Sequence, residues 1–267
     1  MNKIGLIAGN GRFPMLFAQA AKAKGFGVIC VAIEEEADKK ISEYADEVFW
    51  IKLGEFSKLI TIFKQEGIDK AVMAGQIKKA HIFDTSLKLD NIAKTILNSI
   101  SNNRDTLILS AAIAKLKSSG IKIINSATFL GELLPERGIL TKRKPTDKER
   151  ADIAFGVPIA RKIAALDIGQ AIAVKERVVV AVEAVERTDE TIKRAAKLAG
   201  PGLVIIKVAR PFQDMRFDIP VVGINTIKAL IEAGSNVLAV ESKKTLLMDR
   251  DELINFADAN GISVVSV

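Results

Sequence analysis

Cysteine and histidine are nearly absent from this chain of 267 residues, which holds one cysteine, Cys30, and one histidine, His81. One residue of each kind provides no disulfide framework, no cysteine-based zinc site and no histidine-rich metal site, and we expect no catalytic triad. Cys30 lies in the apolar run GVICVAI, which is typical of a buried hydrophobe in a protein of a reducing compartment. Chemistry in this chain must therefore rest on carboxylates, lysine, arginine and, where a metal takes part, a hard ion such as Mg²⁺.

Long apolar runs and aromatic residues are also scarce. No stretch reaches the length of about 18 apolar residues that a membrane-spanning helix needs, and the N-terminal MNKIGLIAG does not resemble a signal peptide, so we expect a soluble, cytoplasmic protein. Aromatic residues make up 5% of the chain, and no zinc finger or RNA-binding signature occurs, which argues against a nucleic-acid partner. The net charge of +7 favours anionic partners such as phosphorylated metabolites or an acidic lipid surface, although a solvated lysine-rich surface is the simpler explanation.

Short apolar runs alternate with amphipathic stretches through the first half of the chain. Strands are predicted at KIGLIAG, FGVICVAI, EVFWIKL and KAVMAG, and helices at FPMLFAQAAKAKG, FSKLITIFKQEG and roughly residues 85–119. This alternation predicts parallel βαβ units in a Rossmann-like domain. The second half begins with a predicted hairpin that turns near residues 175–177, followed by alternating helices and strands, which indicates a distinct α/β domain with a mixed sheet.

The stretch LLPERGILTKRKPTDKER separates the two halves. It carries proline, glycine and dense charge where the apolar periodicity lapses, which is typical of a linker. We therefore predict an α/β protein with a Rossmann-like N-terminal domain over residues 1–135 and a catalytic-type C-terminal domain over residues 136–267.

A glycine-rich turn, GLIAGNGRFP, follows the first predicted strand. Gly9 and Gly11 stand where backbone N–H groups could approach a phosphate, but Arg12 follows directly and the third glycine of the dinucleotide fingerprint is missing. The acidic run in VAIEEEAD stands where a ribose-binding carboxylate would lie. Contact with a nucleotide or sugar phosphate and a purely structural turn both remain open.

The most charged loop between apolar runs is RPFQDMRFDIPVVG, residues 210–223. An extended backbone would point Asp214, Arg216 and Asp218 to one side and anchor Met215 and Phe217 in the core. The polar residues would then form either a salt-bridge ladder that stabilises a turn or a pair of carboxylates that grips a cation or activates a water.

Two further stretches end predicted strands with polar residues. AVEAVERTDETIKRA places Glu183, Glu186 and Asp189 at a helix start, where Thr188 or Asp189 as N-cap is the simpler explanation. LDIGQAIAV places Gln170 at the mouth of a strand, where a plain turn would suffice.

Taken in order, several segments resemble the UDP-2,3-diacylglucosamine pyrophosphatases of lipid A biosynthesis, of the LpxI type with a Rossmann-like N-terminal domain. These segments are GLIAGNGRFP, AGQIKK, LTKRKPT, ADIAFGVPIARKIAALDIGQAIAVKERVVVAVEAVERTDETIKRA, IKVARPFQDMRFDIPVVGINTIKAL and LAVES…TLLMDRDELINFADANGISVV, and they span nearly the whole chain. The resemblance implies Mg²⁺-dependent hydrolysis of a UDP-diacylglucosamine diphosphate, with water attacking the α-phosphorus to give UMP and the diacylglucosamine 1-phosphate. The expected partners are this lipid-linked UDP-sugar and no nucleic acid; peripheral contact with the inner membrane and a homodimer are left open.

The resemblance also assigns residues. It implies that Asp214 and Asp218 are catalytic and that Asp214, Asp218 and Glu186 hold the metal. It implies these substrate contacts: Gly9, Asn10, Gly11, Arg12, Gln76, Lys78, Gln170, Thr188, Asp189, Lys207, Arg210, Gln213, Arg216 and Thr226.

This chain departs from the family pattern at three places. Arg187 stands where the family usually has glycine, Arg210 where it has lysine, and Asn103-Arg104-Asp105 where it has Gly-Asp-Asp. Two other functions are carried as alternatives, an NAD(P)-dependent oxidoreductase and a non-catalytic nucleotide-sugar binding protein.

Overall fold

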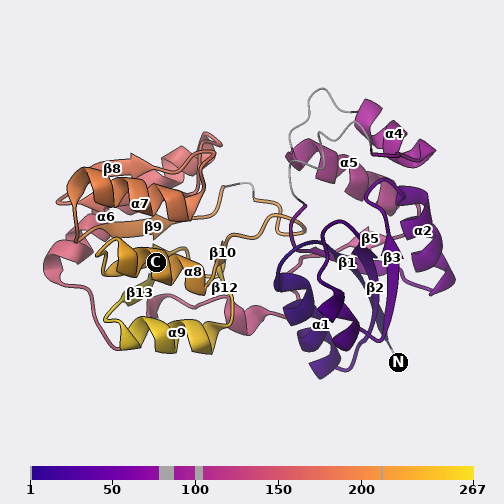
Figure 1. Ribbon diagram of the computed structural model, residues 1–267, viewed down its shortest axis with the longest axis horizontal. Helices are drawn as coiled ribbons and strands as arrows, with labels where there is room; N and C mark the ends of the chain where they lie inside the picture. Colours follow the sequence, from indigo (N-terminus) through magenta and orange to yellow (C-terminus); the bar gives the residue numbers. More distant parts are fainter. Residues whose placement is uncertain (1, 78–86, 100–104, 212) are drawn as a thin grey trace. The chain divides into compact units, whose positions relative to one another are not determined.

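The computed structural model describes residues 2–77, 87–99, 105–211 and 213–267 (Figure 1). The chain divides into two compact units. The N-terminal unit comprises Met1–Leu130 and Met215–Phe217, and the C-terminal unit comprises Gly131–Asp214 and Asp218–Val267. Each unit is α/β with its own main sheet, which confirms the predicted fold class. Within the described ranges, none of the helices has the length and apolar character to cross a bilayer.

The N-terminal unit is built on a parallel sheet with the strand order β3-β2-β1-β4-β5. Its strands are β1 (Lys3–Ala8), β2 (Gly27–Ile33), β3 (Glu47–Ile51), β4 (Lys70–Ala74) and β5 (Lys122–Ile123). The chain order reverses between β1 and β4. At such a switch point the loops beyond the carboxyl ends of the strands diverge, which is where open α/β sheets bind ligands.

Helices cover both faces of this sheet. They are α1 (Phe13–Ala23), α2 (Phe56–Gln65), α4 (Asn91–Asn98), α5 (Asp105–Ser118) and the 3₁₀ helix η1 (Lys39–Glu43). Alternate residues of β2, beginning at Ile29, join a core with Phe63 of α2 and Leu116 of α5. The residues between them include Cys30, and burial raises the pKa of its thiol to about 12. The cysteine is therefore a buried hydrophobe, as its apolar setting predicts, and not a nucleophile.

The C-terminal unit has a mixed sheet with the strand order β6-β13-β11-β9-β7-β8. Its strands are β6 (Gly138–Ile139), β7 (Ala171–Lys175), β8 (Val178–Val182), β9 (Val204–Lys207), β11 (Val237–Val240) and β13 (Ser263–Ser266). A separate parallel pair is formed by β10 (Val221–Val222) and β12 (Leu246–Leu247). The predicted hairpin is present, because β7 and β8 pair antiparallel around Glu176 and Arg177, which both have positive φ.

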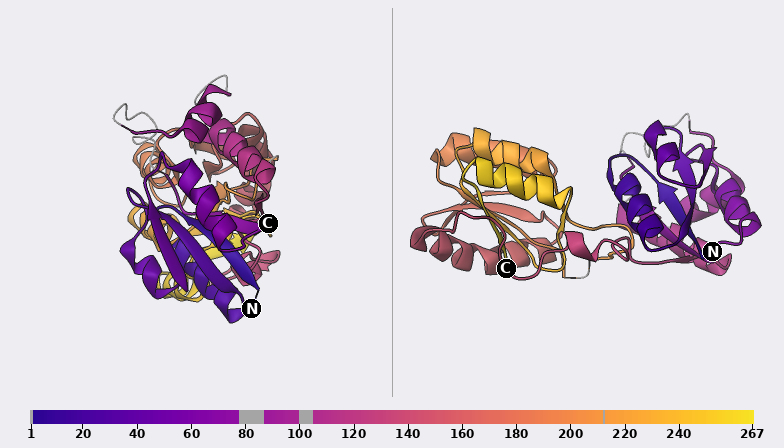
Figure 2. Two further views of the ribbon diagram at one scale, coloured as in Figure 1. Left: turned by 90° about the vertical axis from the view of Figure 1, so that its right-hand side faces the viewer. Right: turned by 90° about the horizontal axis from the view of Figure 1, so that it is seen from below.

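Helices cover both faces of this sheet, with α6 (Asp147–Ala165) on one face and α7 (Thr188–Ala199), α8 (Ile224–Glu232) and α9 (Arg250–Ala259) on the other. The layers can be followed in Figure 2 (right). The alternation along β9 fits both layers: Val204 and Ile206 pack in the core that α6 joins, and Ile205 packs in the core beneath α7 to α9. This arrangement brings the ends of α6, β8 and β9 close to the start of α7.

Helix α6 begins inside the charged stretch that its composition marks as a linker. Thr146 and Glu149 form a reciprocal capping box, with Thr146 N–H donating to Glu149 Oε2 over 2.7 Å and Glu149 N–H to Thr146 Oγ1 over 3.3 Å. Pro158 and Gly156 lie within the helix and obscure its periodicity. Part of the charge in that stretch therefore belongs to the first turn of a helix.

Candidate active site

The charged loop is a turn and not the extended segment that its alternating sequence predicts. Asp218 N–H donates to the Asp214 carbonyl over 3.0 Å, which closes the turn. Ser126 holds the loop from outside, because its Oγ donates to the carbonyls of Met215 (3.1 Å) and Arg216 (2.7 Å). The extended conformation is therefore wrong, although Phe217 does pack against a core, that of the N-terminal unit.

Arg210 lies at the centre of the polar residues in the C-terminal unit. Its Nε is 2.7 Å from Asp167 Oδ1, and its Nη1 donates to Asp218 Oδ2 over 2.8 Å. Asp167 follows the last residue of helix α6 by two positions, so this cation joins the end of that helix to the charged loop. The Arg210 and Asp218 side chains are 31% and 37% exposed, which leaves this pair open to a ligand while restraining both groups.

Two glutamines extend this centre. Gln213 accepts the Arg210 backbone N–H at Oε1 over 2.7 Å and donates its Nε2 to the Asp218 carbonyl over 2.6 Å. Gln170 Nε2 donates to the same Gln213 Oε1 over 2.8 Å. These bonds fix the backbone on both sides of the turn, and they bring together four residues that the resemblance assigns to the site: Gln170, Arg210, Gln213 and Asp218.

A second cation continues the network. Glu183 accepts the Gln170 backbone N–H over 2.9 Å and the Thr188 hydroxyl over 2.8 Å, and Lys207 Nζ donates to that hydroxyl over 3.1 Å. Burial lowers the pKa of the Lys207 ammonium below its ordinary value, and the carboxylates of Glu183, Asp189 and Asp218 oppose that shift. Lys207 is a half-buried cation, and the negative charge of Asp218 interacts with it electrostatically.

The start of α7 differs from the simple N-cap that its sequence predicts. Arg187 occupies the cap position without a side-chain cap bond, Thr188 donates to Glu183, and Asp189 accepts the Thr226 hydroxyl over 3.0 Å. Neither Thr188 nor Asp189 is the cap, because both side chains turn toward the polar network. The backbone of Arg187 has φ 72° and ψ 167°, a region that glycine occupies readily and other residues do not.

Glu186 does not join Asp214 and Asp218. Its carboxylate accepts Arg194 Nη2 over 2.6 Å and the Ala184 N–H over 3.1 Å. The pKa of Glu186 lies below its ordinary value because its own backbone N–H and then the Arg194 guanidinium stabilise the charged form. Across the described part of the chain, no three acidic, histidine or cysteine side chains gather as a metal site would require.

The glycine-rich turn of the N-terminal unit closes on the loop after β4. Asn10 and Gln76 form an isolated bridge, with Asn10 N–H donating to the Gln76 carbonyl over 2.8 Å and Gln76 N–H to the Asn10 carbonyl over 3.0 Å. A Cβ at Gly9 would lie 2.7 Å from the Gln76 carbonyl oxygen. The backbone N–H groups of Asn10 and Gln76 each donate to the carbonyl of the other residue, which favours a structural role for Gly9 over a phosphate cradle.

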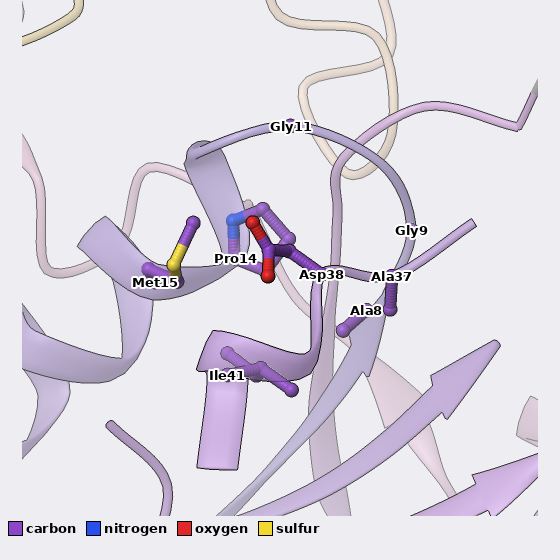
Figure 3. A pocket seen from close by; sticks show the side chains of 8 residues that line it. All are labelled: Ala8, Gly9, Gly11, Pro14, Met15, Ala37, Asp38 and Ile41. Carbon is purple, nitrogen blue, oxygen red and sulfur yellow. The ribbon is translucent and has the colours of Figure 1, made fainter. Parts of the chain in front are cut away.

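A small hollow lies beside this turn, between α1 and η1 (Figure 3). Gly11 has φ 96° at its rim, and Met15 and Ile41 supply apolar walls. Asp38 faces the same hollow, but its carboxylate accepts the Lys40 N–H over 2.9 Å and so caps η1. The acidic run after β2 therefore contributes a structural cap at this position.

The remaining predicted residues fall into two units. Arg12 and Arg216 belong to the N-terminal unit with Gly9, Asn10, Gly11 and Gln76, and Lys78 lies outside the described residues. Two members of the network are absent from the predicted set, Asp167 and Glu183. Glu183 could have been found by the polar residues that end its strand, whereas nothing near Asp167 in the sequence indicates its partner Arg210.

Models of one protein family match nearly the whole chain. The LpxI N-terminal domain matches residues 3–133 and the LpxI C-terminal domain matches residues 136–265. A UDP-2,3-diacylglucosamine pyrophosphatase LpxI from Caulobacter vibrioides is 32% identical over 280 residues, which cover 100% of this chain and 98% of that protein.

Likeness to solved structures is weak. A UDP-glucose-4-epimerase from Stenotrophomonas maltophila, with bound NAD and formylated UDP-arabinopyranose, is 13% identical with a TM-score of 0.30, over 45% of this chain and 35% of that chain. The biotin carboxylase domain of a thermophilic 2-oxoglutarate carboxylase, bound to ADP, is 15% identical with a TM-score of 0.31, over 75% of this chain and 34% of that chain. The chain thus matches about a third of each solved chain, and these likenesses carry no argument.

The backbone at Arg187 yields a stability prediction. Arg187→Gly should raise the free energy of unfolding by about 1 kcal/mol, because glycine removes strain worth about 1–3 kcal/mol and loses part of that gain to its greater freedom when unfolded. Urea denaturation followed by circular dichroism measures the change. Arg187→Ala is the control, since it removes the charge but keeps the strain. An equal gain in both variants would mean that charge, and not backbone conformation, is responsible.

Proposed function

The chain belongs to the LpxI family, and we propose that it hydrolyses the diphosphate of UDP-2,3-diacylglucosamine to UMP and 2,3-diacylglucosamine 1-phosphate. The observation that carries this proposal is the 32% identity to a UDP-2,3-diacylglucosamine pyrophosphatase over the full length of both chains. The polar network around Arg210 supports it, because it supplies the charges that cleavage of a diphosphate requires.

Cleavage of a diphosphate needs cations near the phosphate oxygens and a positioned water. Arg210 contacts Asp167 through Nε and Asp218 through Nη1. Neither of these two pairs involves its Nη2, which can therefore donate to a phosphate oxygen. Lys207 adds a second cation in the same network. Both can stabilise negative charge as it shifts onto the leaving phosphate, and their fixed hydrogen bonds reduce the reorganisation needed during reaction.

Asp214 and Asp218 are the proposed catalytic carboxylates. The hydrogen bond between their backbones sets their spacing, and Arg210 holds one oxygen of Asp218 in place. The second oxygen of Asp218 can accept a proton from an attacking water, with Asp214 nearby in the turn. We propose attack on the α-phosphorus, which makes UMP the product that receives the oxygen of water.

We propose that Asp214 and Asp218 would hold a Mg²⁺ ion. Mg²⁺ is usually bound by one or two carboxylates together with substrate phosphates and water, so Asp214 and Asp218 suffice as protein ligands. Glu186 is committed to Arg194, and we leave it out of the ligand set. When bound, the ion would shield the diphosphate oxygens and lower the barrier to attack by water.

The first prediction about activity concerns the two carboxylates. Asp218→Ala and Asp214→Ala should each lower kcat by about 10²-fold or more, because a carboxylate that orients water or metal contributes several kcal/mol to the transition state. Melting temperature and specific activity are measured on the same samples, with Glu190→Ala on the surface of α7 as the control. If both aspartates only brace the turn, the variants will melt earlier and the folded fraction will keep its specific activity.

The second prediction concerns the metal. Exhaustive treatment with EDTA followed by its removal should abolish hydrolysis, and added Mg²⁺ should restore it, because we propose that Asp214, Asp218 and the substrate phosphates bind the ion together. A mock-treated sample controls for losses during handling. Full activity in the treated protein without added metal would refute the dependence on Mg²⁺.

The third prediction concerns the attacked phosphorus. Hydrolysis in water enriched in oxygen-18 should label the phosphate of UMP, because the new P–O bond forms at the α-phosphorus. Mass spectrometry of both products from a single turnover reads out the position of the label. Label in the diacylglucosamine 1-phosphate would instead place the attack on the other phosphorus.

A further inference from the structure

Three large apolar side chains project into solvent at one end of the β7–β8 hairpin. Val185 is 98% exposed, Leu166 is 68% exposed and Ile168 is 47% exposed. We call these three residues the apolar rim. The rim adjoins the proposed active site, because Asp167, between two of its members, is the residue that pairs with Arg210.

The backbone holds the rim residues in place. At the end of α6, Ile168 N–H donates to the Ile163 carbonyl over 3.4 Å and Asp167 N–H to the Ala164 carbonyl over 3.1 Å, a Schellman motif with Asp167 at the left-handed position. Such motifs usually bury the apolar residue that Ile168 represents, yet it is half exposed here. The apolar surface is therefore displayed by a well-ordered helix end.

The two loops of the rim are in direct contact. Glu183 N–H donates to the Ala171 carbonyl over 2.8 Å, which continues the pairing of β7 and β8 toward the rim. Any Cβ on Gly169 would clash with the carbonyl oxygen of Glu183, so these backbones touch at that point. Val185 lies in the turn two residues beyond Glu183, and Ile168 directly precedes Gly169, so this backbone contact brings the two loops that carry them together.

The charges around the rim are cationic in balance. The acidic neighbours are neutralised, since Asp167 pairs with Arg210 at 2.7 Å and Glu186 with Arg194 at 2.6 Å. Lys162 stands one turn before Leu166, and Arg187 follows Val185 by two residues. Both are exposed, and neither forms an ion pair with another residue in the described ranges.

We infer that the apolar rim is a docking surface for an anionic lipid bilayer. Leu166, Ile168 and Val185 enter the interface, and Lys162 and Arg187 meet the anionic headgroups. This inference rests on the proposed function in one respect: a diacyl substrate resides in a bilayer, and the rim adjoins the residues proposed to cleave it.

A second copy of the chain is a poorer occupant. A stable protein interface buries roughly 800 Å² on each partner, and three side chains on two loop tips offer much less than that. Isolated apolar side chains next to cations suit the surface of a lipid bilayer, because lipids rearrange around them and no complementary shape is needed. The net charge of +7 adds long-range attraction to an anionic surface.

Vesicle sedimentation with the full chain tests the surface. The probes are vesicles of phosphatidylglycerol with phosphatidylethanolamine and vesicles of phosphatidylcholine alone. The wild type should sediment with the anionic vesicles, and the triple variant Leu166→Asn, Ile168→Asn, Val185→Asn should bind them at least about 10-fold more weakly, since each lost apolar side chain removes buried area. Lys162→Gln with Arg187→Gln should weaken binding to the anionic vesicles in the same way as added salt.

The matched control replaces exposed apolar residues elsewhere in the same unit. Val178→Asn with Leu198→Asn changes side chains that are 60% and 66% exposed, with Val178 at the opposite end of the hairpin, and this variant should bind like the wild type. Circular dichroism confirms that each variant folds. Equal binding by the rim variant and the wild type would overturn the assignment, as would loss of a wild-type dimer in the rim variant with vesicle binding unchanged.

Hydrolysis assays distinguish a failure of the proposed reaction from a failure of the docking surface. The rim variant should still hydrolyse a short-chain UDP-diacylglucosamine dispersed in water, and it should lose turnover only of long-chain substrate held in vesicles. A wild type that binds anionic vesicles through the rim but hydrolyses neither substrate would overturn the proposed reaction and support the docking surface.

Discussion

The candidate active site depends on the pairing of one guanidinium with two carboxylates from distant parts of the chain. Arg210 contacts Asp167 at the end of α6 and Asp218 in the charged loop. Charged groups that leave water are stabilised by pairing, and the partly buried Arg210 is paired with both carboxylates. The loop therefore takes its shape from a charge requirement, and Gln213 completes that shape by bonding the backbone at both ends of the turn.

From this centre a chain of hydrogen bonds runs to the start of α7. Gln213, Gln170, Glu183, Thr188 and Lys207 follow one another, and each is bonded to the next. Gln170, Glu183 and Lys207 lie at ends of β7, β8 and β9, Thr188 begins α7 and Gln213 lies in the charged loop, so the sheet sets the positions of most of the network. A network fixed in this way can present cations and carboxylates to a diphosphate with little reorganisation, which is the property that phosphoanhydride cleavage demands of a protein.

Local pattern determined much of the fold but little of the site. Alternating apolar runs predict the parallel sheet and the β7–β8 hairpin, because strand periodicity and turn chemistry are encoded within a few residues. Helix α6 was not predicted because Pro158 and Gly156 interrupt its apolar periodicity, although the Thr146–Glu149 capping box marks its start. The turn at residues 214–218 and the partnership of Asp167 with Arg210 depend on tertiary contacts, one of them with Ser126, so no local rule could have predicted them.

Gly169 links the surface of the C-terminal unit to its interior. Its missing side chain lets the end of α6 lie directly on the backbone of Glu183, whose carboxylate holds Thr188 and the backbone of Gln170. Any larger residue would displace the apolar rim and the polar network together. The apolar rim and the polar network are therefore coupled through the backbone at Gly169. A substitution in either part must leave this close backbone contact intact, because position 169 accepts only glycine.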